Sequence, residues 1–175
     1  MSNVIKTQRL ILRPFEPRDE LAYTSIRAKP ENVRFLPGGE ATAEQAEEIA
    51  PRQVASFAAL WQGEPGFGPW AAEERLTGEL IGHVGLRRLP DLGGETEVLY
   101  LVDSSRWGLG YATEGAAAAL EFGFSVLNLS KIIAMALPEN SASIRVMEKV
   151  GMRRESGLFR AFDLDLVRYS LSKES

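Results

Sequence analysis

The stretch Val98-Leu-Tyr-Leu-Val-Asp-Ser-Ser-Arg-Trp-Gly-Leu-Gly-Tyr-Ala-Thr-Glu114 combines a short apolar strand, a glycine-containing turn and the start of an alanine-rich helix. A turn of this kind directs several backbone N–H groups toward one place, at the positive end of a helix, where phosphate oxygens bind well. Gly108 and Gly110, followed by Ala112, let a ligand approach the main chain closely. The stretch therefore predicts a site that holds a pyrophosphate on backbone amides.

The composition limits the classes of protein to consider. A chain of 175 residues with ordinary globular composition suits one domain over residues 1–175. No apolar run approaches the ~20 residues that span a bilayer, so we expect no membrane segment. Cysteine is absent and His83 is the single histidine, which excludes thiolate nucleophiles and argues against a metal site or a Ser-His-Asp triad. The net charge of −4 argues against nucleic-acid binding, and the lack of cysteine suits a cytoplasmic setting.

The N-terminal part reads as a strand followed by a helix. Residues 8–13 alternate in a way that predicts the first strand, and a proline follows it directly. A helix is expected to begin near Pro17, because proline suits a first helical turn. We expect this helix to turn Leu21 and Ile26 toward the interior. Residues 63–69 are rich in glycine and proline and read as a loop.

A second helix is predicted over residues 42–61. Thr42, with Gln45 three residues on, forms a capping-box signal at its start. Pro51 lies inside the pattern, so we expect a kink or two shorter helices. The positions that recur at helical spacing and should face the core are Ala46, Ile49, Ala50, Gln53, Val54, Phe57, Leu60 and Trp61.

The remaining segments predict an α/β fold with a mixed sheet. A strand, a glycine turn, a helix and a second strand form a β-α-β unit, so strands 95–102 and 131–137 should be parallel neighbours. The expected segments are antiparallel strands at 70–74, 80–87 and 95–102, a helix at 111–127, a buried strand at 131–137, a helix from Asn140 or Ser141 that Gly151 closes, and two strands within 152–171.

Two common phosphate-binding designs do not fit this unit. A Walker P-loop requires a lysine directly after its glycines, and none follows Gly110. A Rossmann fingerprint requires a third glycine where Thr113 stands and an acid at the end of the next strand, for which Glu139 lies too late. The unit also lies in mid-chain behind antiparallel strands, which is unusual for a dinucleotide-binding fold.

The order of segments resembles the GNAT superfamily of acetyl-CoA-dependent N-acetyltransferases, and most closely its RimJ/RimL-like branch, which includes enzymes that acetylate the N-termini of ribosomal proteins. The resemblance implies a GNAT fold, in which a mostly antiparallel sheet contains a central parallel β-α-β unit flanked by helices. Besides the quoted stretch, the similar segments are Thr7-Gln-Arg-Leu-Ile-Leu-Arg-Pro14, Thr77-Gly-Glu-Leu-Ile-Gly-His-Val-Gly-Leu86 and Asn140-Ser-Ala-Ser-Ile-Arg-Val-Met-Glu-Lys-Val-Gly-Met152.

The same resemblance implies a set of residues that hold the cosubstrate, acetyl-CoA. Main-chain amides of the glycine loop would grip the pyrophosphate, and the strand before it would pair with the peptide-like pantetheine arm. Trp107 stands where the superfamily usually has glutamine or arginine, which indicates a different support for the loop. The implied cofactor-binding residues are Tyr100, Leu101, Val102, Trp107, Gly108, Leu109, Gly110, Tyr111, Ala112, Thr113, Asn140, Ser143 and Arg145.

Each of these assignments has a structural alternative. The strand residues are also ordinary core residues, and Asn140 is also a good helix N-cap. Arg106, Arg145 and Lys149 are candidates for neutralising phosphate, although exposed charges are usually only solvated.

The catalytic groups are implied by position in the family pattern. Many GNAT enzymes use a tyrosine on the last helix as the acid, but Met147 stands there. In the RimJ/RimL-like branch a serine one turn into that helix has been given this role, and Ser143 matches it, although serine is also a common local cap. Glu97 is the first candidate for the general base, with a cross-strand ion pair as the alternative. The other candidates for the base are Glu73, Glu74 and His83.

We therefore expect acetyl transfer from acetyl-CoA to a primary amine by direct attack. At pH 7 an α-amine is ~14% neutral and a lysine amine only ~0.04% neutral, a difference of about 3.5 kcal/mol. A site with few basic groups should prefer the α-amine of a protein or peptide N-terminus. The alternatives are a small-molecule amine, such as a polyamine, aminoglycoside or amino-acid-like amine, and a non-catalytic CoA-binding sensor. A homodimer is one possible assembly, because such enzymes are frequently dimers, but the sequence does not fix the oligomeric state.

Overall fold

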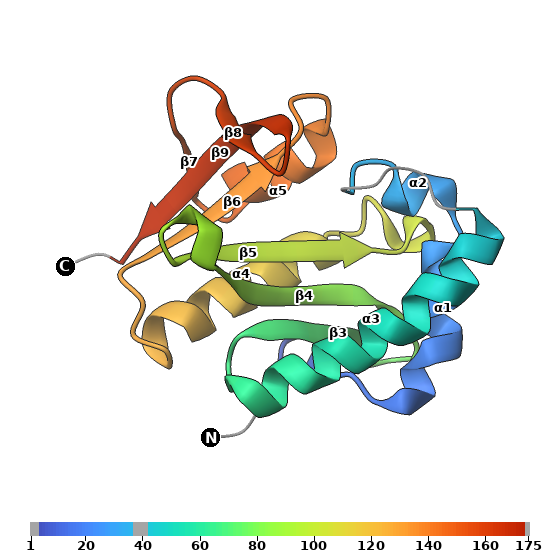
Figure 1. Cartoon of the computed structure of the whole chain (residues 1–175). Helices are drawn as coiled ribbons and strands as arrows, with labels where there is room; N and C mark the ends of the chain where they lie inside the picture. Colours follow the sequence, from blue (N-terminus) through green and yellow to red (C-terminus); the bar gives the residue numbers. More distant parts are fainter. Residues whose placement is uncertain (1–3, 37–41, 174–175) are drawn as a thin grey trace.

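The computed structural model describes residues 4–36 and 42–173, which form one mixed sheet with helices on both faces (Figure 1). Within these residues the strand order is β1-β2-β3-β4-β5-β6-β9-β7, and β8 pairs with β9. Every pairing is antiparallel except that of β5 with β6. The strands are β1 (Ile5–Lys6), β2 (Leu10–Arg13), β3 (Gly68–Glu74), β4 (Leu80–Leu89), β5 (Glu95–Val102), β6 (Lys131–Ala136), β7 (Arg153–Arg154), β8 (Phe159–Ala161) and β9 (Leu164–Ser172).

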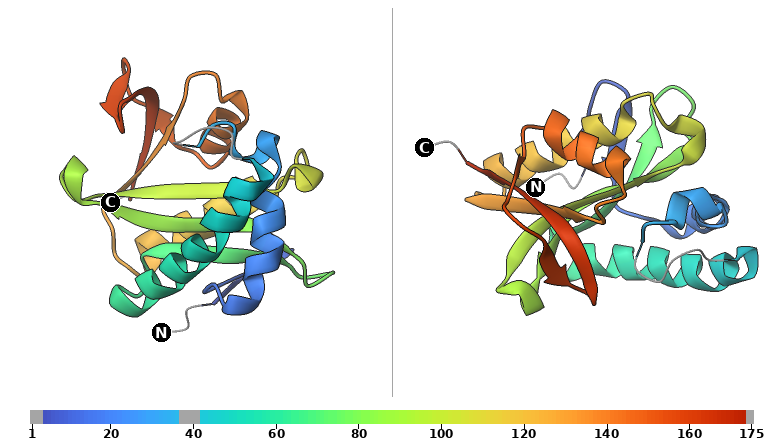
Figure 2. Two further views of the ribbon diagram at one scale, coloured as in Figure 1. Left: turned by 45° about the vertical axis from the view of Figure 1, so that its right-hand side comes forward. Right: turned by 90° about the horizontal axis from the view of Figure 1, so that it is seen from above.

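The helices lie in two layers on opposite faces of the sheet (Figure 2). One face carries α1 (Glu20–Arg27), α2 (Pro30–Val33) and α3 (Ala43–Gly63), and the other carries α4 (Tyr111–Ser125) and α5 (Ser141–Lys149). Side chains alternate along β4: His83 packs against rings of α1 and α3, and Val84 lies beneath α4. Short 3-10 turns occur at η1 (Pro17–Asp19), η2 (Pro90–Leu92) and η3 (Ser104–Arg106).

Small residues let α4 lie close to the sheet. A Cβ at Gly115 would be 2.7 Å from Cγ2 of Val84, and a Cβ at Gly123 would be 2.6 Å from Cδ1 of Ile132. Ala116 and Ala119 of the same helix are fully buried. The alanine-rich composition of α4 therefore permits close packing, and this packing holds the helix start beside the end of β5.

The parallel pairing between β5 and β6 is short, and the sheet has a gap beyond it. Glu97 opposite Ile133 is the one registered position between β5 and β6, and the two strands then separate (Figure 1). The N–H of Asp103 donates to the carbonyl of Ile81. In an antiparallel pair every second residue bonds to the same neighbour, so every second residue of β5, counted back from Asp103, directs its backbone N–H and C=O toward β4. Tyr100, which lies between those positions, directs its backbone N–H and C=O toward the gap that β6 has left.

The predicted β-α-β unit is confirmed, including the parallel pairing of the strands that begin at Glu95 and Lys131. The inward position predicted for Leu21 is wrong, and of the two alternatives expected at Pro51 the division into two shorter helices is wrong. Leu21 is 80% exposed, because α1 instead turns Tyr23, Ile26 and Arg27 inward at i, i+3 and i+4. No division occurs at Pro51: α3 is continuous through it, since Ala46, Ala50 and Val54 pack against the interior on both sides of the proline.

Two strand predictions also differ from the structure. The strand predicted over residues 8–13 is β2 and begins at Leu10, because Thr7 and Leu10 close a turn between β1 and β2 in which the N–H of Thr7 donates to the Leu10 carbonyl at 3.0 Å. The tail contains three strands, β7, β8 and β9, rather than two. The turn at Phe162 and Asp163, both of which adopt positive φ, joins β8 to β9, and β7 pairs with β9 farther along, at Tyr169 and Ser170.

Gly85→Ala should destabilise the fold, because its Cβ would lie 2.5 Å from the carbonyl oxygen of Gly68 and 2.6 Å from Cα of Pro69. Backbone atoms of β3 cannot rotate away, so we expect a loss of about 1–3 kcal/mol in the free energy of unfolding, measured in urea. Gly63→Ala is the matched control, since nothing lies within 4 Å of its Cβ. Equal stability of the two variants would contradict this account of the β3–β4 contact.

Candidate active site

A cavity of about 400 Å³, the main cavity, occupies the place where β5 and β6 separate. Glu97 and Leu99 reach it from the face of β5 that also carries α1 and α3, and Val98 and Tyr100 reach it from the opposite face. The cavity therefore connects the two faces of the sheet. A ligand on one face can meet a second ligand on the other face at this point.

Glu97 lies in the cavity wall with its carboxylate held by Arg87, the residue directly opposite on β4. The Oε2 atom of Glu97 accepts hydrogen bonds from Nη2 of Arg87 at 2.5 Å and from Nε at 3.2 Å. Burial raises the pKa of Glu97, and the Arg87 guanidinium partly opposes that rise. The cross-strand ion pair that the sequence left open is thus present, and Glu97 still borders the cavity.

Ser143 and Tyr100 form a hydroxyl pair on the other side of the cavity. Their oxygens are 2.9 Å apart, and the Tyr100 hydroxyl also donates to the carbonyl of Ser143 at 3.1 Å. Burial raises the pKa of Tyr100 to about 12, so the phenol keeps its proton at neutral pH. Asn140 caps α5, because its Oδ1 accepts from the N–H of Ser143 at 3.1 Å. Met147, one turn after Ser143, lines the same wall.

His83 lies at the base of the cavity on the α1 and α3 side, among aromatic rings. Its Nδ1 is 3.0 Å from the hydroxyl of Tyr23. Burial lowers the pKa of His83 to about 3, so the ring is neutral at pH 7 and a very weak proton acceptor. His83 is consequently a poor general base, although it contacts the cavity.

The segment after β5 presents the positive end of α4. Gly108 and Gly110 adopt φ values of 76° and 85°, which favour glycine, and Gly110 is the N-cap of the helix without a side-chain cap. The first N–H groups of an α-helix have no acceptor within the helix. The backbone donors of Tyr111, Ala112 and Thr113 therefore point out of the helix start. This arrangement suits a phosphate group.

The glycine loop is held by Arg9 and Trp107. Nη1 of Arg9 donates to the carbonyl of Leu109 at 2.8 Å, and its Nε pairs with Glu114 of α4 at 2.7 Å. Thr7 donates to the same carboxylate, and the Arg9 guanidinium lies 4.4 Å above the Tyr111 ring. The indole N–H of Trp107 donates to the carbonyl of Val102 at 2.7 Å. The loop is thus connected to the turn before β2 on one side and to the end of β5 on the other.

The other candidate residues occupy different places. Leu101 and Val102 are buried core residues, and Leu109 is exposed on the loop. Arg145 and Lys149 are exposed on α5. The remaining phosphate candidate, Arg106, is paired with Glu79 at 2.6 Å and with Glu74 at 3.3 Å.

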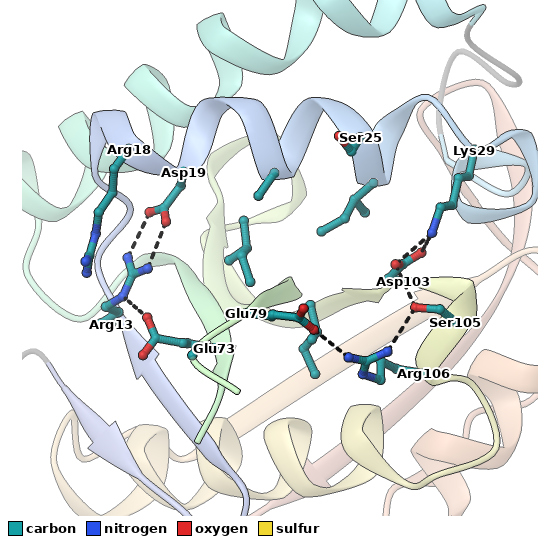
Figure 3. Close-up of a pocket in the computed structure, with 15 residues that line it drawn as sticks. Arg13, Arg18, Asp19, Ser25, Lys29, Glu73, Glu79, Asp103, Ser105 and Arg106 are labelled. Carbon is teal, nitrogen blue, oxygen red and sulfur yellow. Dashed lines mark hydrogen bonds and ion pairs between the residues drawn. The ribbon is translucent and has the colours of Figure 1, made fainter. Parts of the chain in front are cut away.

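A second cavity, of about 460 Å³, lies between α1 and the strand ends of β3 and β4. Its charges are paired across it: Arg13 with Asp19 and Glu73, Lys29 with Asp103, and Arg106 with Glu79 (Figure 3). Although burial alone would raise it, hydrogen bonds from Lys29, Asn32 and Ser105 lower the pKa of Asp103 to about 2.

These pairs fasten α1 and α2 to the sheet and to the start of the glycine loop. Two candidates for the base have roles away from the main cavity, since Glu73 lies in this cluster and Glu74 accepts a hydrogen bond from Tyr111.

Sequence reasoning did not identify the residues that α1 contributes to the main cavity, Tyr23 and Arg27. The signal was present in the spacing, because Arg27 is four residues after Tyr23 and shares the buried face of α1. A charged residue on the apolar face of an amphipathic helix is rare, and it indicates a functional role. Gln53 and Phe57 of α3 were assigned to the core, and they line the cavity instead of only filling space.

Two other classes of site, metal centres and membrane-spanning helices, are absent from the part of the chain that the structure describes. No group of three or more His, Cys, Asp or Glu side chains there is arranged to hold a metal ion. Among the described helices, none combines the length and the apolar character that a membrane crossing needs.

Known proteins share both the sequence and the fold. The family model for an acetyltransferase (GNAT) domain matches residues 9–153. The uncharacterized N-acetyltransferase YoaA of Bacillus subtilis is 33% identical over 162 residues, which cover 93% of this chain and 89% of that protein.

Solved structures agree with this match. A GNAT-family acetyltransferase from Bacillus anthracis superposes with a TM-score of 0.77 at 27% identity, covering 97% of this chain and 98% of the other. Mycobacterium smegmatis RimJ in complex with CoA-disulfide shares the fold, with a TM-score of 0.79 at 24% identity over 97% of this chain and 86% of the other. This chain belongs to the GNAT family of acetyltransferases, and acetyl-CoA is its cosubstrate.

Proposed function

We propose that this N-acetyltransferase acetylates the α-amine of a protein or peptide N-terminus, the acceptor that the RimJ/RimL-like resemblance implies. The observation that carries the proposal is the charge of the main cavity. In the described part of the chain, its charged lining residues are Arg27, Arg87 and Glu97, and Glu97 is already paired with Arg87. A polyamine carries several positive charges and needs carboxylates that this wall does not offer. A single α-amine needs none.

The cosubstrate is assigned to the α4 and α5 face. The residues present fit it, because the helix start at Tyr111 offers backbone donors to phosphate and Tyr100 offers an unpaired backbone edge to an amide-containing arm. Asn140 and Ser143 extend this edge into α5. Arg145 is placed on the same helix as a candidate for an outer phosphate. The acceptor then enters from the α1 and α3 face, where Tyr23 and Phe57 line the cavity.

Acetyl-CoA supplies an activated acetyl group, to which the amine nitrogen forms a bond as the bond to sulfur breaks. We assign the proton for the sulfur to the Ser143 hydroxyl, which the phenol of Tyr100 can resupply across 2.9 Å. Glu97 is the candidate for accepting the proton from the amine, directly or through water, since burial raises its pKa toward the range in which a carboxylate is a useful base. The Arg87 pairing limits that rise, so an amine that is partly neutral at pH 7 suits this site.

A shorter similarity supports the competing polyamine reading. The spermidine N(1)-acetyltransferase of Escherichia coli is 32% identical over 85 residues, about half of this chain (49%) and of that protein (46%). The match leaves half of each chain uncovered. The charge of the acceptor side therefore weighs more in our choice.

The test of the proposal is a panel of acceptors assayed by CoA release at pH 7. Peptides with a free N-terminus should be acetylated, and an N-terminally blocked peptide with one lysine should react at least about 100-fold more slowly, because about 300-fold less of its amine is neutral. Spermidine should be a poor acceptor. Faster turnover of spermidine than of every peptide would refute the proposal, and tight CoA binding without turnover of any amine would favour a sensor.

Ser143→Ala should lower kcat by about 100-fold while the Kd for CoA changes little, because a general acid contributes roughly that factor to the rate. Ser141→Ala is the matched control, since this exposed serine begins the same helix. Steady-state kinetics and calorimetry give the two quantities. Unchanged turnover in Ser143→Ala would remove this serine from the mechanism.

Arg9→Met should raise the Kd for CoA about tenfold, because it removes charged hydrogen bonds to Leu109 and Glu114 that hold the glycine loop. Arg160→Met is the control, since Arg160 is exposed on β8 and makes a single ion pair with Asp165. Isothermal titration calorimetry measures both variants. An unaltered Kd in Arg9→Met would show that the loop keeps its shape without this support.

A further inference from the structure

Arg27 is a buried cation in the acceptor side of the main cavity. It is 7% exposed, and its Nε has no hydrogen-bond partner among the described residues. Within those residues no carboxylate lies within ion-pair distance of it. Arg168 shows the difference, because its Nε also lacks a hydrogen bond but lies 3.0 Å from the Glu155 carboxylate.

The groups around Arg27 do not neutralise it. On its own helix it interacts with the Tyr23 hydroxyl, and burial raises the pKa of that phenol to about 12, so the phenol is uncharged at neutral pH. The nearby His83 of β4 is also neutral, since burial lowers its pKa to about 3. The carboxylate in the cavity, Glu97, is committed to Arg87. A buried guanidinium without an anion is costly, and it binds an anionic ligand strongly when one arrives.

Gln53 of α3 adds a second unpaired polar group to the same cavity. Its buried Oε1 has no donor among the described residues. The cavity thus offers the unpaired Nε–H of a guanidinium on α1 and an unpaired amide carbonyl on α3. A molecule with a carboxylate and a nearby N–H group would satisfy both, whereas a neutral alkylamine would leave Arg27 unpaired.

We propose that Arg27 binds a carboxylate of the acceptor, so that this enzyme prefers amines with a carboxylate only a few bonds away. The inference rests on the proposed function, because it assigns the substrate class of the same acceptor site. Two kinds of acceptor share this chemistry: a peptide whose first residue is aspartate or glutamate, and a free amino acid. A guanidinium matches a carboxylate with two parallel hydrogen bonds, which also orients the amine toward the Glu97 side of the cavity.

The experiment compares acceptors in matched pairs with the native enzyme and with Arg27→Gln. Peptides that begin with aspartate or asparagine form one pair, and free alanine and alaninamide form the other. The native enzyme should favour the carboxylate member of the peptide pair by about 10- to 100-fold in kcat/KM, as expected for a hydrogen-bonded charge pair. Comparing each ratio between the two enzymes cancels the different basicities of the amines, and Arg27→Gln should bring the peptide ratio close to one.

The two pairs also separate the sources of the carboxylate. Dependence on Arg27 in the peptide pair alone assigns an acidic N-terminal residue, and dependence in the alanine pair alone assigns a free amino acid. Arg27→Lys should retain part of the preference, because it keeps the charge. Arg18→Gln is the control variant, since Arg18 is exposed outside the main cavity and pairs with Glu16.

Stability distinguishes this role from a structural one. Because Arg27 has no anionic partner among the described residues, Arg27→Gln should keep or raise the Tm, whereas loss of a structural ion pair would lower it. A binding measurement does not depend on turnover. With CoA present, the acetylated aspartyl peptide should bind the native enzyme at least about tenfold more tightly than it binds Arg27→Gln.

An equal preference in native enzyme and Arg27→Gln, in both turnover and binding, overturns the role of Arg27. Acetylation of neutral peptides without any carboxylate preference leaves the proposed function standing and refutes this inference alone. Absence of turnover with all peptides and amino acids refutes the proposed function, and the measurement of peptide binding then still decides the role of Arg27.

Discussion

The separation of β5 from β6 after a single registered position is the constraint on which the site depends. Glu97 pairs with Ile133, and beyond it β5 keeps β4 as its partner while β6 pairs with β9. In the part of the chain that the structure describes, no strand pairs with the backbone N–H and C=O that Tyr100 directs away from β4. Unpaired backbone groups in a sheet are costly unless water or a ligand meets them. The break in the sheet therefore creates both the cavity and the hydrogen-bonding edge that a coenzyme arm can use.

Charge is distributed unevenly around this break. On one side, hydroxyl and amide groups of Tyr100, Ser143 and Asn140 face the cavity without net charge. On the other side the described lining has two guanidiniums, Arg27 and Arg87, and one carboxylate, Glu97, which pairs with Arg87. Low-dielectric surroundings make such an imbalance count for more than it would on the surface. The neutral side suits proton donation to a leaving thiolate, and we propose that the cationic side selects among acceptors.

Much of the fold was predictable because it depends on local patterns. The apolar run of β6, the capping box at Thr42 and the glycine turn before Tyr111 each carry their own signal, and all three occur where the sequence indicated. The structure differs from the sequence expectations where tertiary packing outweighed local preference. Pro51 is accommodated within α3 by the buried residues on each side, and the inward face of α1 is set by Tyr23 rather than by Leu21. Periodicity alone does not fix the phase of an eight-residue helix.

The sequence by itself determined the β-α-β unit and the phosphate-suited turn, because these follow from residues that are close together in the chain, and it determined the family through the order of four such segments. Only the tertiary structure decided the chemistry around the reacting groups. Arg27 and Glu97 are 70 positions apart, as their numbers show, and Tyr100 meets Ser143 across the gap between β5 and α5. Whether a buried charge has a partner depends on such distant neighbours, and no local pattern reports it. The ion pair of Glu97 and the unpaired cation of Arg27 are two results of that kind.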